Sequence, residues 1–235
     1  LHTGRLDSAE ALVRWYDPAT DSYRSPSTFI PFFEMNGFIN RLDRYIYEQV
    51  LKMLGERIRE GRPIVPVSVN ISRVTLQKPD FIDFYVGLKN QYKIRDGYIT
   101  LEITESVAYD NYENMALIVE RLRRNGFFCS VDDFGTGYSS YHLLKTLQMD
   151  EIKLDGSLLR AGLSPDRDRT VLKHIVSLTE NLHMKIVQEG VETQEQVDML
   201  KALSFDVIQG YYYSKPLSPT DYCVFLDSRE DEIFS

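Results

Sequence analysis

Two adjacent aspartates, Asp132 and Asp133, stand at the end of an apolar run and are followed by Gly135 and Gly137. Because neighbouring residues of a strand point to opposite faces, one ligand engages both carboxylates only where the strand ends and its pleat relaxes. The two glycines provide that ending. An acidic turn without a ligand is the alternative for the pair taken alone. The pair predicts a strand that delivers carboxylates to a loop.

Polar residues recur at or near the ends of the other predicted strands. They are Asn70, Glu102, Asp132, Lys153, Glu189 and Gln209, in chain order, with Glu10 from the first strand. In a parallel barrel the side chains at these ends converge over one mouth, where such enzymes carry out their chemistry. Alternatively, Glu10 and Arg14 form a weak pair on a solvated edge, and Lys153 forms a salt bridge with an aspartate at the edge of the core.

Converging acids create an electrostatic problem. Two carboxylates about 5 Å apart repel each other by roughly 3 kcal/mol at an effective dielectric constant near 20. A divalent cation removes that penalty, and carboxylate and amide oxygens favour Mg²⁺ or Mn²⁺ over zinc. None of the four histidines shows a paired metal spacing. A bridging aspartate suits two ions about 3.5–4 Å apart, a geometry that hydrolyses phosphodiesters. Lys153 would neutralise the phosphoryl oxygens or orient the attacking water.

These residues require a scaffold in which strands and helices alternate. We predict strands at 8–15, 64–70, 98–105, 127–132, 151–155, 184–187 and 205–208. The predicted helices cover 26–37, 40–60, 79–92, 111–124, 141–147, 166–182, 194–203 and 220–226, with Asn40 and Thr193 as N-caps. The alternation indicates an α/β fold with a parallel sheet. An eight-stranded TIM-type (β/α)₈ barrel whose first strand lies upstream of Leu1 fits best, and an open doubly wound sheet is the alternative.

Composition limits the classes of function. The chain has 235 residues, of which 43% are hydrophobic, and we expect residues 1–235 to form a single domain. A formal net charge of −8 argues against binding to a nucleic acid polymer. No apolar run reaches eighteen residues and no signal peptide is evident, so we expect a cytoplasmic protein with no membrane contact from this segment. Cys129 and Cys223 are expected to be small core residues rather than a disulfide.

Seven motifs in order resemble those of an EAL domain. They are Glu-Ala-Leu at 10–12, Val-Asn-Ile-Ser at 69–72, Leu-Glu-Ile-Thr-Glu-Ser at 101–106, Asp-Asp-Phe-Gly-Thr-Gly-Tyr-Ser-Ser at 132–140, Ile-Lys-Leu-Asp at 152–155, Glu-Gly-Val-Glu-Thr at 189–193 and Gln-Gly-Tyr at 209–211. The resemblance implies a modified TIM-type barrel that hydrolyses cyclic di-GMP to linear pGpG with two Mg²⁺ or Mn²⁺ ions. Calcium is expected to inhibit. A weak or inactive cyclic di-GMP receptor is the alternative.

The resemblance also implies roles for individual residues. Metal ligands match Glu10, Asn70, Glu102, Asp132, Asp133 and Glu189. The residues that match catalytic positions are Glu189 as a general base, Lys153 near the nucleophilic water, Gln209 as a water-positioning amide and Glu105 as the anchor of the loop after Asp133. Substrate contacts match Leu12, Arg14 and Pro216.

Two features concern assembly and departures from the family pattern. The resemblance implies a homodimer formed through the loop after Asp133, and an upstream sensor or GGDEF domain is expected. Gln188 replaces a commoner alanine, and Tyr141 replaces a commoner leucine. Neither departure removes a predicted metal ligand.

Overall fold

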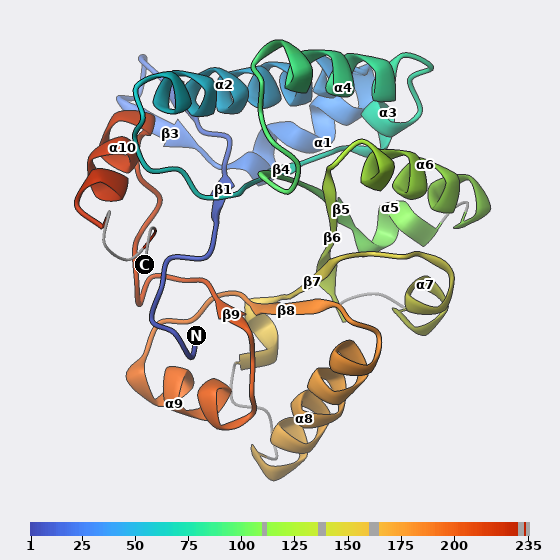
Figure 1. The fold of residues 1–235 in the computed structure, drawn as a ribbon, viewed down its shortest axis with the longest axis vertical. Helices are drawn as coiled ribbons and strands as arrows, with labels where there is room; N and C mark the ends of the chain where they lie inside the picture. Colours follow the sequence, from blue (N-terminus) through green and yellow to red (C-terminus); the bar gives the residue numbers. More distant parts are fainter. Residues whose placement is uncertain (110–111, 136–139, 160–164, 230–232, 234–235) are drawn as a thin grey trace.

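One parallel sheet forms the centre of the fold in the computed structural model, which describes residues 1–109, 112–135, 140–159, 165–229 and 233 (Figure 1). Its order is β1-β4-β5-β6-β7-β8-β9, and every adjacent pair is parallel. The bounds are β1 Ala9–Ala11, β4 Val67–Asn70, β5 Ile99–Thr104, β6 Phe128–Phe134, β7 Glu151–Leu154, β8 Lys185–Gln188 and β9 Val207–Ile208.

The strand order follows the chain order without a reversal. In a doubly wound sheet the order of the strands reverses at a switch point. This sheet has no such reversal, so the doubly wound alternative is wrong. The curved sheet with its helices outside confirms the predicted modified TIM-type barrel (Figure 1). The edge strands are β1 and β9. The N-terminal segment reaches the β9 side, since the amino group of Leu1 donates to the carbonyl oxygen of Asp206 at 2.7 Å.

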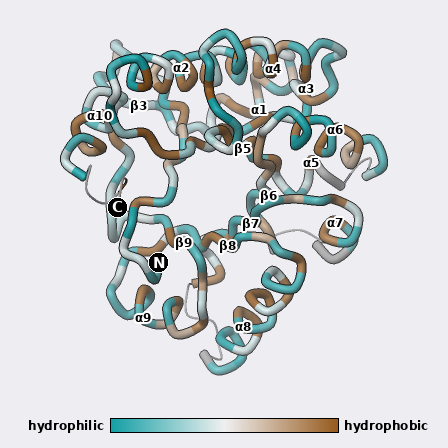
Figure 2. Tube along the Cα trace, viewed as in Figure 1, coloured by the Kyte–Doolittle hydropathy of each residue, from teal (hydrophilic) through white to brown (hydrophobic). Residues whose placement is uncertain are grey.

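Helices cover the outside of the sheet, and their sequence pattern is amphipathic. They are α1 Pro26–Asn36, α2 Ile39–Arg59, α3 Arg73–Leu76, α4 Phe81–Gln91, α5 Glu105–Tyr109, α6 Tyr112–Arg124, α7 Ser140–Thr146, α8 Pro165–Asn181, α9 Gln194–Ala202 and α10 Pro219–Asp227, with the 3₁₀ helix η1 Gly156–Leu159. Hydrophobic and hydrophilic residues alternate along these helices (Figure 2). None of the helices in the described ranges is long and apolar enough to cross a membrane.

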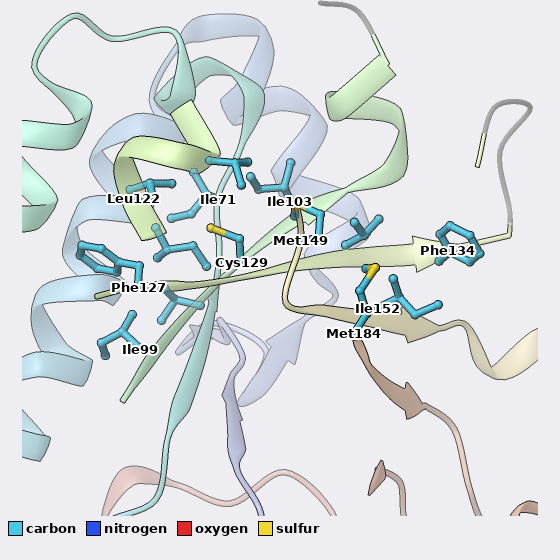
Figure 3. Close-up of a cluster of buried hydrophobic side chains, with 14 of the residues drawn as sticks. Ile71, Ile99, Ile103, Leu122, Phe127, Cys129, Phe134, Met149, Ile152 and Met184 are labelled. Atoms are coloured by element: carbon cyan, nitrogen blue, oxygen red, sulfur yellow. The ribbon is translucent and has the colours of Figure 1, made fainter. Parts of the chain in front are cut away.

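The core lies between the sheet and this helical layer. Figure 3 shows part of it, where Ile99 and Cys129 from β5 and β6 lie among residues such as Leu122 of α6. Cys129 is fully buried, and burial raises the pKa of its thiol to about 12, so it is a core residue as predicted. Cys223 is a second free thiol, half-buried in α10.

Two details of the predicted elements are wrong. The strand expected at 8–15 ends at Ala11, and Trp15–Asp17 forms β2, which pairs antiparallel with β3, Ser22–Arg24, in a separate hairpin. An ion pair of 2.6 Å between Arg24 and Asp17 links the two strands of this hairpin, which is not part of the main sheet. Asn40 is not an N-cap, because α2 begins at Ile39 and the Asn40 amide donates to Thr75 instead.

The N-cap expected at Thr193 is confirmed. The Thr193 hydroxyl accepts from the Gln196 amide, and the Gln196 side chain accepts from the backbone of Thr193 in return. This capping box fixes where α9 starts, directly after the Glu189 segment.

Candidate active site

The ammonium group of Lys153 lies at the centre of a cluster of carboxylates. Its Nζ atom is 2.7 Å from Glu189, 2.8 Å from Glu102, 3.0 Å from Glu10 and 3.9 Å from Asp132. The Lys153 side chain is 3% exposed, which is too little for water to solvate the charge. Burial alone would lower the pKa of Lys153, but the surrounding acids raise it well above its usual value. The lysine therefore stays protonated.

Strand alternation explains how these side chains meet. In β7, Ile152 and Leu154 are buried in the outer core, so the intervening Lys153 points to the opposite, inner face. The same pattern in β5 buries Leu101 and Ile103 and turns Glu102 inward. The parallel register then brings the ends of neighbouring strands to one side of the sheet.

Glu10 is held by three donors. Asn70 donates to one carboxylate oxygen at 3.0 Å, while Lys153 and Gln209 donate to the other at 3.0 and 2.8 Å. Burial raises the pKa of Glu10, but the charge of Lys153 and these hydrogen bonds outweigh it and leave the pKa below its usual value. Glu10 is therefore ionised, and it joins strands from both ends of the chain.

Glu102 is the most deeply buried acid of the cluster, at 1% exposure. Burial raises its pKa well above the usual value, against the opposing charge of Lys153. Oε1 forms the ion pair with Lys153, and Oε2 accepts no hydrogen bond from any described residue. A buried carboxylate oxygen in that state is expensive for a structural role alone.

Asp132 and Asp133 stand where β6 becomes irregular. The register with β7 shifts between Val131 and Phe134, and Asp133 has a φ of +54°. The Asp133 amide donates to the Asp132 carboxylate at 2.9 Å. Burial first, then neighbouring acids, raise the pKa of both carboxyl groups. The predicted relaxation of the pleat at this pair is therefore observed.

The segment after Asp133 is tied to a buried acid. Glu105, at 4% exposure, accepts a hydrogen bond of 3.1 Å from the amide of Gly135. The role of Glu105 as the anchor of the loop stays a prediction. Dimerisation is expected through the loop after Asp133, of which residues 136–139 lie outside the described residues.

The predicted substrate residues are not part of the charged network described above. Leu12, Arg14 and Pro216 are all exposed, and the Arg14 guanidinium donates to the carbonyl of Val13 at 2.7 Å. Their placement leaves them accessible to a ligand. Their roles stay predictions.

The acids of the cluster have the chemistry of metal ligands but surround a lysine. Among the described residues, no group of three or more His, Cys, Asp or Glu side chains is arranged to hold one. Lys153 explains why the acids are not arranged around a metal ion, because the carboxylates surround its ammonium group instead. The donors themselves suit a hard divalent cation, since all are carboxylate or amide oxygens and Oε2 of Glu102 accepts no hydrogen bond from a described residue.

Glu189 has the electrostatic character of an acid or base near neutral pH. Burial raises its pKa to about 7, although Lys153 acts in the opposite direction. A group with that pKa exchanges a proton readily at physiological pH.

Sequence reasoning did not assign a role to Gln188 or Asp155. Gln188 is fully buried beside Glu189, and the charge of Asp155 contributes to raising the pKa of Asp132 and Asp133. The signal for Gln188 was its departure from the usual alanine. Asp155 was visible only as the last residue of the motif at 152–155.

The chain belongs to the EAL domain family, whose pattern it matches over residues 1–216. It is 34% identical over 217 residues to the cyclic di-GMP phosphodiesterase NbdA of Pseudomonas aeruginosa, covering 92% of this chain and 28% of that protein. It is also 34% identical to the probable cyclic di-GMP phosphodiesterase PdeG of Escherichia coli K12, covering 96% of this chain and 44% of that protein. The chain thus spans less than half the length of these curated relatives.

A solved structure shares the fold. The PaMucR phosphodiesterase in complex with c-di-GMP superposes with a TM-score of 0.84 at 29% sequence identity. The match covers 91% of this chain and 86% of that one. The sheet and its helices are therefore those of a known EAL structure.

Proposed function

We propose that this chain hydrolyses one phosphodiester bond of cyclic di-GMP to give linear pGpG. The observation that carries the proposal is the cluster of Glu10, Glu102, Asp132 and Glu189 around Lys153 at one side of the sheet. A purely structural core has no use for so many converging charges, because buried ion pairs add little stability over apolar residues. The names of the curated relatives support the choice of substrate.

Mg²⁺ or Mn²⁺, with two ions expected, would neutralise the phosphate and lower the pKa of a water molecule. The residues proposed to hold them are Glu10, Asn70, Glu102, Asp132, Asp133 and Glu189. Calcium coordinates more loosely, so we expect it to occupy the acids without supporting turnover.

Other residues would act on substrate and water directly. Lys153 would stabilise the negative charge that develops on the phosphoryl oxygens. Glu189 would accept a proton from the attacking water, for which its pKa of about 7 is suited. Gln209 would orient that water through its amide. Leu12, Arg14 and Pro216 would contact a guanine, a phosphate and the wall of the pocket.

We also propose that residues 1–235 act as one domain within a longer signalling protein. The support is that both curated relatives are much longer than this chain. A sensor or GGDEF domain upstream and a homodimer formed through the loop after Asp133 belong to the same proposal. The anchoring of Gly135 by Glu105 is the contact that would connect dimerisation to the site.

The test is chromatography of cyclic di-GMP incubated with the chain and magnesium, manganese, calcium or chelator in parallel. We expect pGpG with magnesium and manganese only. Asp132→Asn should abolish turnover, because a neutral amide replaces a carboxylate that is proposed to hold the ions. Full activity of that variant would contradict the two-ion mechanism. Nucleotide binding without product in the unmodified chain would instead identify a receptor.

A further inference from the structure

Gln188 ends β8 as a fully buried amide that faces three carbonyl oxygens. It pairs with Leu154 of β7 in the sheet register and precedes Glu189 in the chain. Its Nε2 atom donates to the carbonyls of Leu154, Asp155 and Glu189 at 3.1, 3.3 and 3.0 Å. Since every partner is an acceptor, the amide nitrogen must be the atom that faces them. The orientation of Gln188 is therefore fixed by its surroundings.

This amide joins the two strands within one residue of the charged cluster. Lys153 precedes Leu154 and Glu189 follows Gln188, and the Lys153 and Glu189 side chains meet at 2.7 Å. The Glu189 amide adds a hydrogen bond of 3.0 Å to the carbonyl of Leu154. The hydrogen bonds from Gln188 and from the Glu189 amide thus hold together the backbone next to Lys153 and the backbone next to Glu189.

A contribution to stability alone does not explain the residue well. Two amide protons are shared among three acceptors, and the buried Oε1 atom accepts no hydrogen bond from a described residue. A buried polar group that is only half satisfied gives little net stability. What its hydrogen bonds do is link the end of β8 to the end of β7 and to the residue that follows β7.

We infer that Gln188 is a positioning residue that holds the Glu189 carboxylate in place by tying the end of β8 to the end of β7. The inference rests on the proposed hydrolysis, in which Glu189 is a base and a metal ligand. Outer partners of metal ligands typically change activity or metal affinity by about 10–100-fold when they are replaced.

The test uses Gln188→Leu, which keeps the size of the side chain and removes its donors. We expect kcat for cyclic di-GMP and the affinity for Mn²⁺ each to fall about 10–100-fold. KM should change less than about threefold, because the proposed substrate contacts lie elsewhere. Hydrogen exchange of the Glu189 amide, measured by NMR, should accelerate. Gln188→Met, which is unbranched, serves as a second variant should the first not fold.

Thr179→Val is the matched control. Thr179 is also fully buried, and its hydroxyl donates to the carbonyl of Val176 at 2.8 Å within α8. We expect this variant to lose stability in urea while its kcat and Mn²⁺ affinity stay unchanged. A general effect of removing a buried hydrogen bond would appear equally in both variants.

The inference is overturned if the Gln188 variants change kcat, Mn²⁺ affinity and Glu189 exchange no more than Thr179→Val does. If the unmodified chain hydrolyses no cyclic di-GMP, the proposed function fails instead. In that case Mn²⁺ affinity, titrated by calorimetry without nucleotide, and the exchange of the Glu189 amide still decide the role of Gln188.

Discussion

The positive charge of Lys153 offsets the repulsion among the four carboxylates around it. A buried cation among four acids is stable only while its partners remain, and the partners depend on it in the same way. Glu102 depends on it most, since its side chain is almost fully buried and its only close cation among the described residues is Lys153. Replacing the lysine therefore affects stability as well as chemistry.

Lys153→Met should abolish turnover and lower the free energy of unfolding by about 3–5 kcal/mol at pH 7, because it leaves buried carboxylates without a counter-charge. Urea denaturation followed by circular dichroism measures this loss. Lys185→Met is the control, since Lys185 pairs with Asp7 at a half-exposed site and should lose less than about 1 kcal/mol. Equal losses in the two variants would mean that the cluster is not specially dependent on its lysine.

Glu105 is the second residue with a contact that is open to test, its hydrogen bond from the Gly135 amide. Glu105→Ala should speed hydrogen exchange at the Gly135 amide and lower the affinity for the metal ion on which turnover depends. The far-UV circular dichroism spectrum should stay unchanged. Glu105→Gln keeps an acceptor oxygen and should preserve most of the protection. Wild-type exchange and metal affinity in the alanine variant would exclude Glu105 as an anchor.

At the level of elements, the segments after β7 and β8 touch through two glycines. A Cβ atom on Gly190, whose φ is +68°, would stand 2.9 Å from the Cα atom of Gly156. The contacted atom is backbone, so it cannot move aside cheaply. Only residues without a side chain allow the ends of these strands to approach so closely.

Gly190→Ala tests this contact against Gly61→Ala. Gly61 has the same φ of +68°, but a Cβ atom on it would meet no other atom within 4 Å. Both variants suffer the left-handed backbone strain, so their difference isolates the close contact. We expect Gly190→Ala to lose about 1–3 kcal/mol more than Gly61→Ala in urea denaturation, together with activity. Equal losses would show that the two segments have room to separate.

The sequence predicted the parallel strands because their apolar runs and intervening helices are regular. It missed the β2 and β3 hairpin, since Trp15 continues the alternation of β1 although the chain has left the sheet. It also misplaced the start of α2, because the Asn40 side chain bonds to Thr75, which is distant in sequence. Local patterns reveal element types, whereas such endings depend on partners that only the folded chain supplies.

Sequence motifs identified the acids of the site, but not their geometry. Strand ends placed Glu10, Glu102 and Asp132 together because a parallel sheet has one carboxyl edge. The sequence did not predict that Lys153 lies at the centre of the cluster, because a lysine considered alone is better explained by a single salt bridge. The buried amide of Gln188 was equally hidden, because its three acceptors are backbone atoms.

On the scale of the whole molecule, Asp227 at the end of α10 pairs with Arg57 of α2 and with Arg62, which follows α2 in the chain. Asp227 accepts from Arg57 at 2.6 Å and pairs with Arg62 at 2.9 Å. The hydrogen bond from Arg57 is the main cause that lowers the pKa of Asp227 below its usual 3.8. A lowered pKa in the folded state adds stability above pH 3.8, and this stability is lost as the pH falls through the folded value.

Asp227→Asn should therefore lower the urea midpoint at pH 7, and the gap from the wild type should narrow as the pH falls below 3.8. Asp198→Asn, an exposed carboxylate bonded to Gln194, is the control and should show little change. A gap that stays constant from pH 7 to pH 3 would exclude the charge of Asp227 as its source.

The hydrogen bond from Gln209 to Glu10 joins residues 199 positions apart in the chain. A ribosome releases Glu10 early and Gln209 near the end of the domain, at about 5–20 residues per second. For that whole interval the nascent chain lacks one of the three donors that hold Glu10. All three donors can therefore surround Glu10 only after Gln209, which follows β9, has left the exit tunnel.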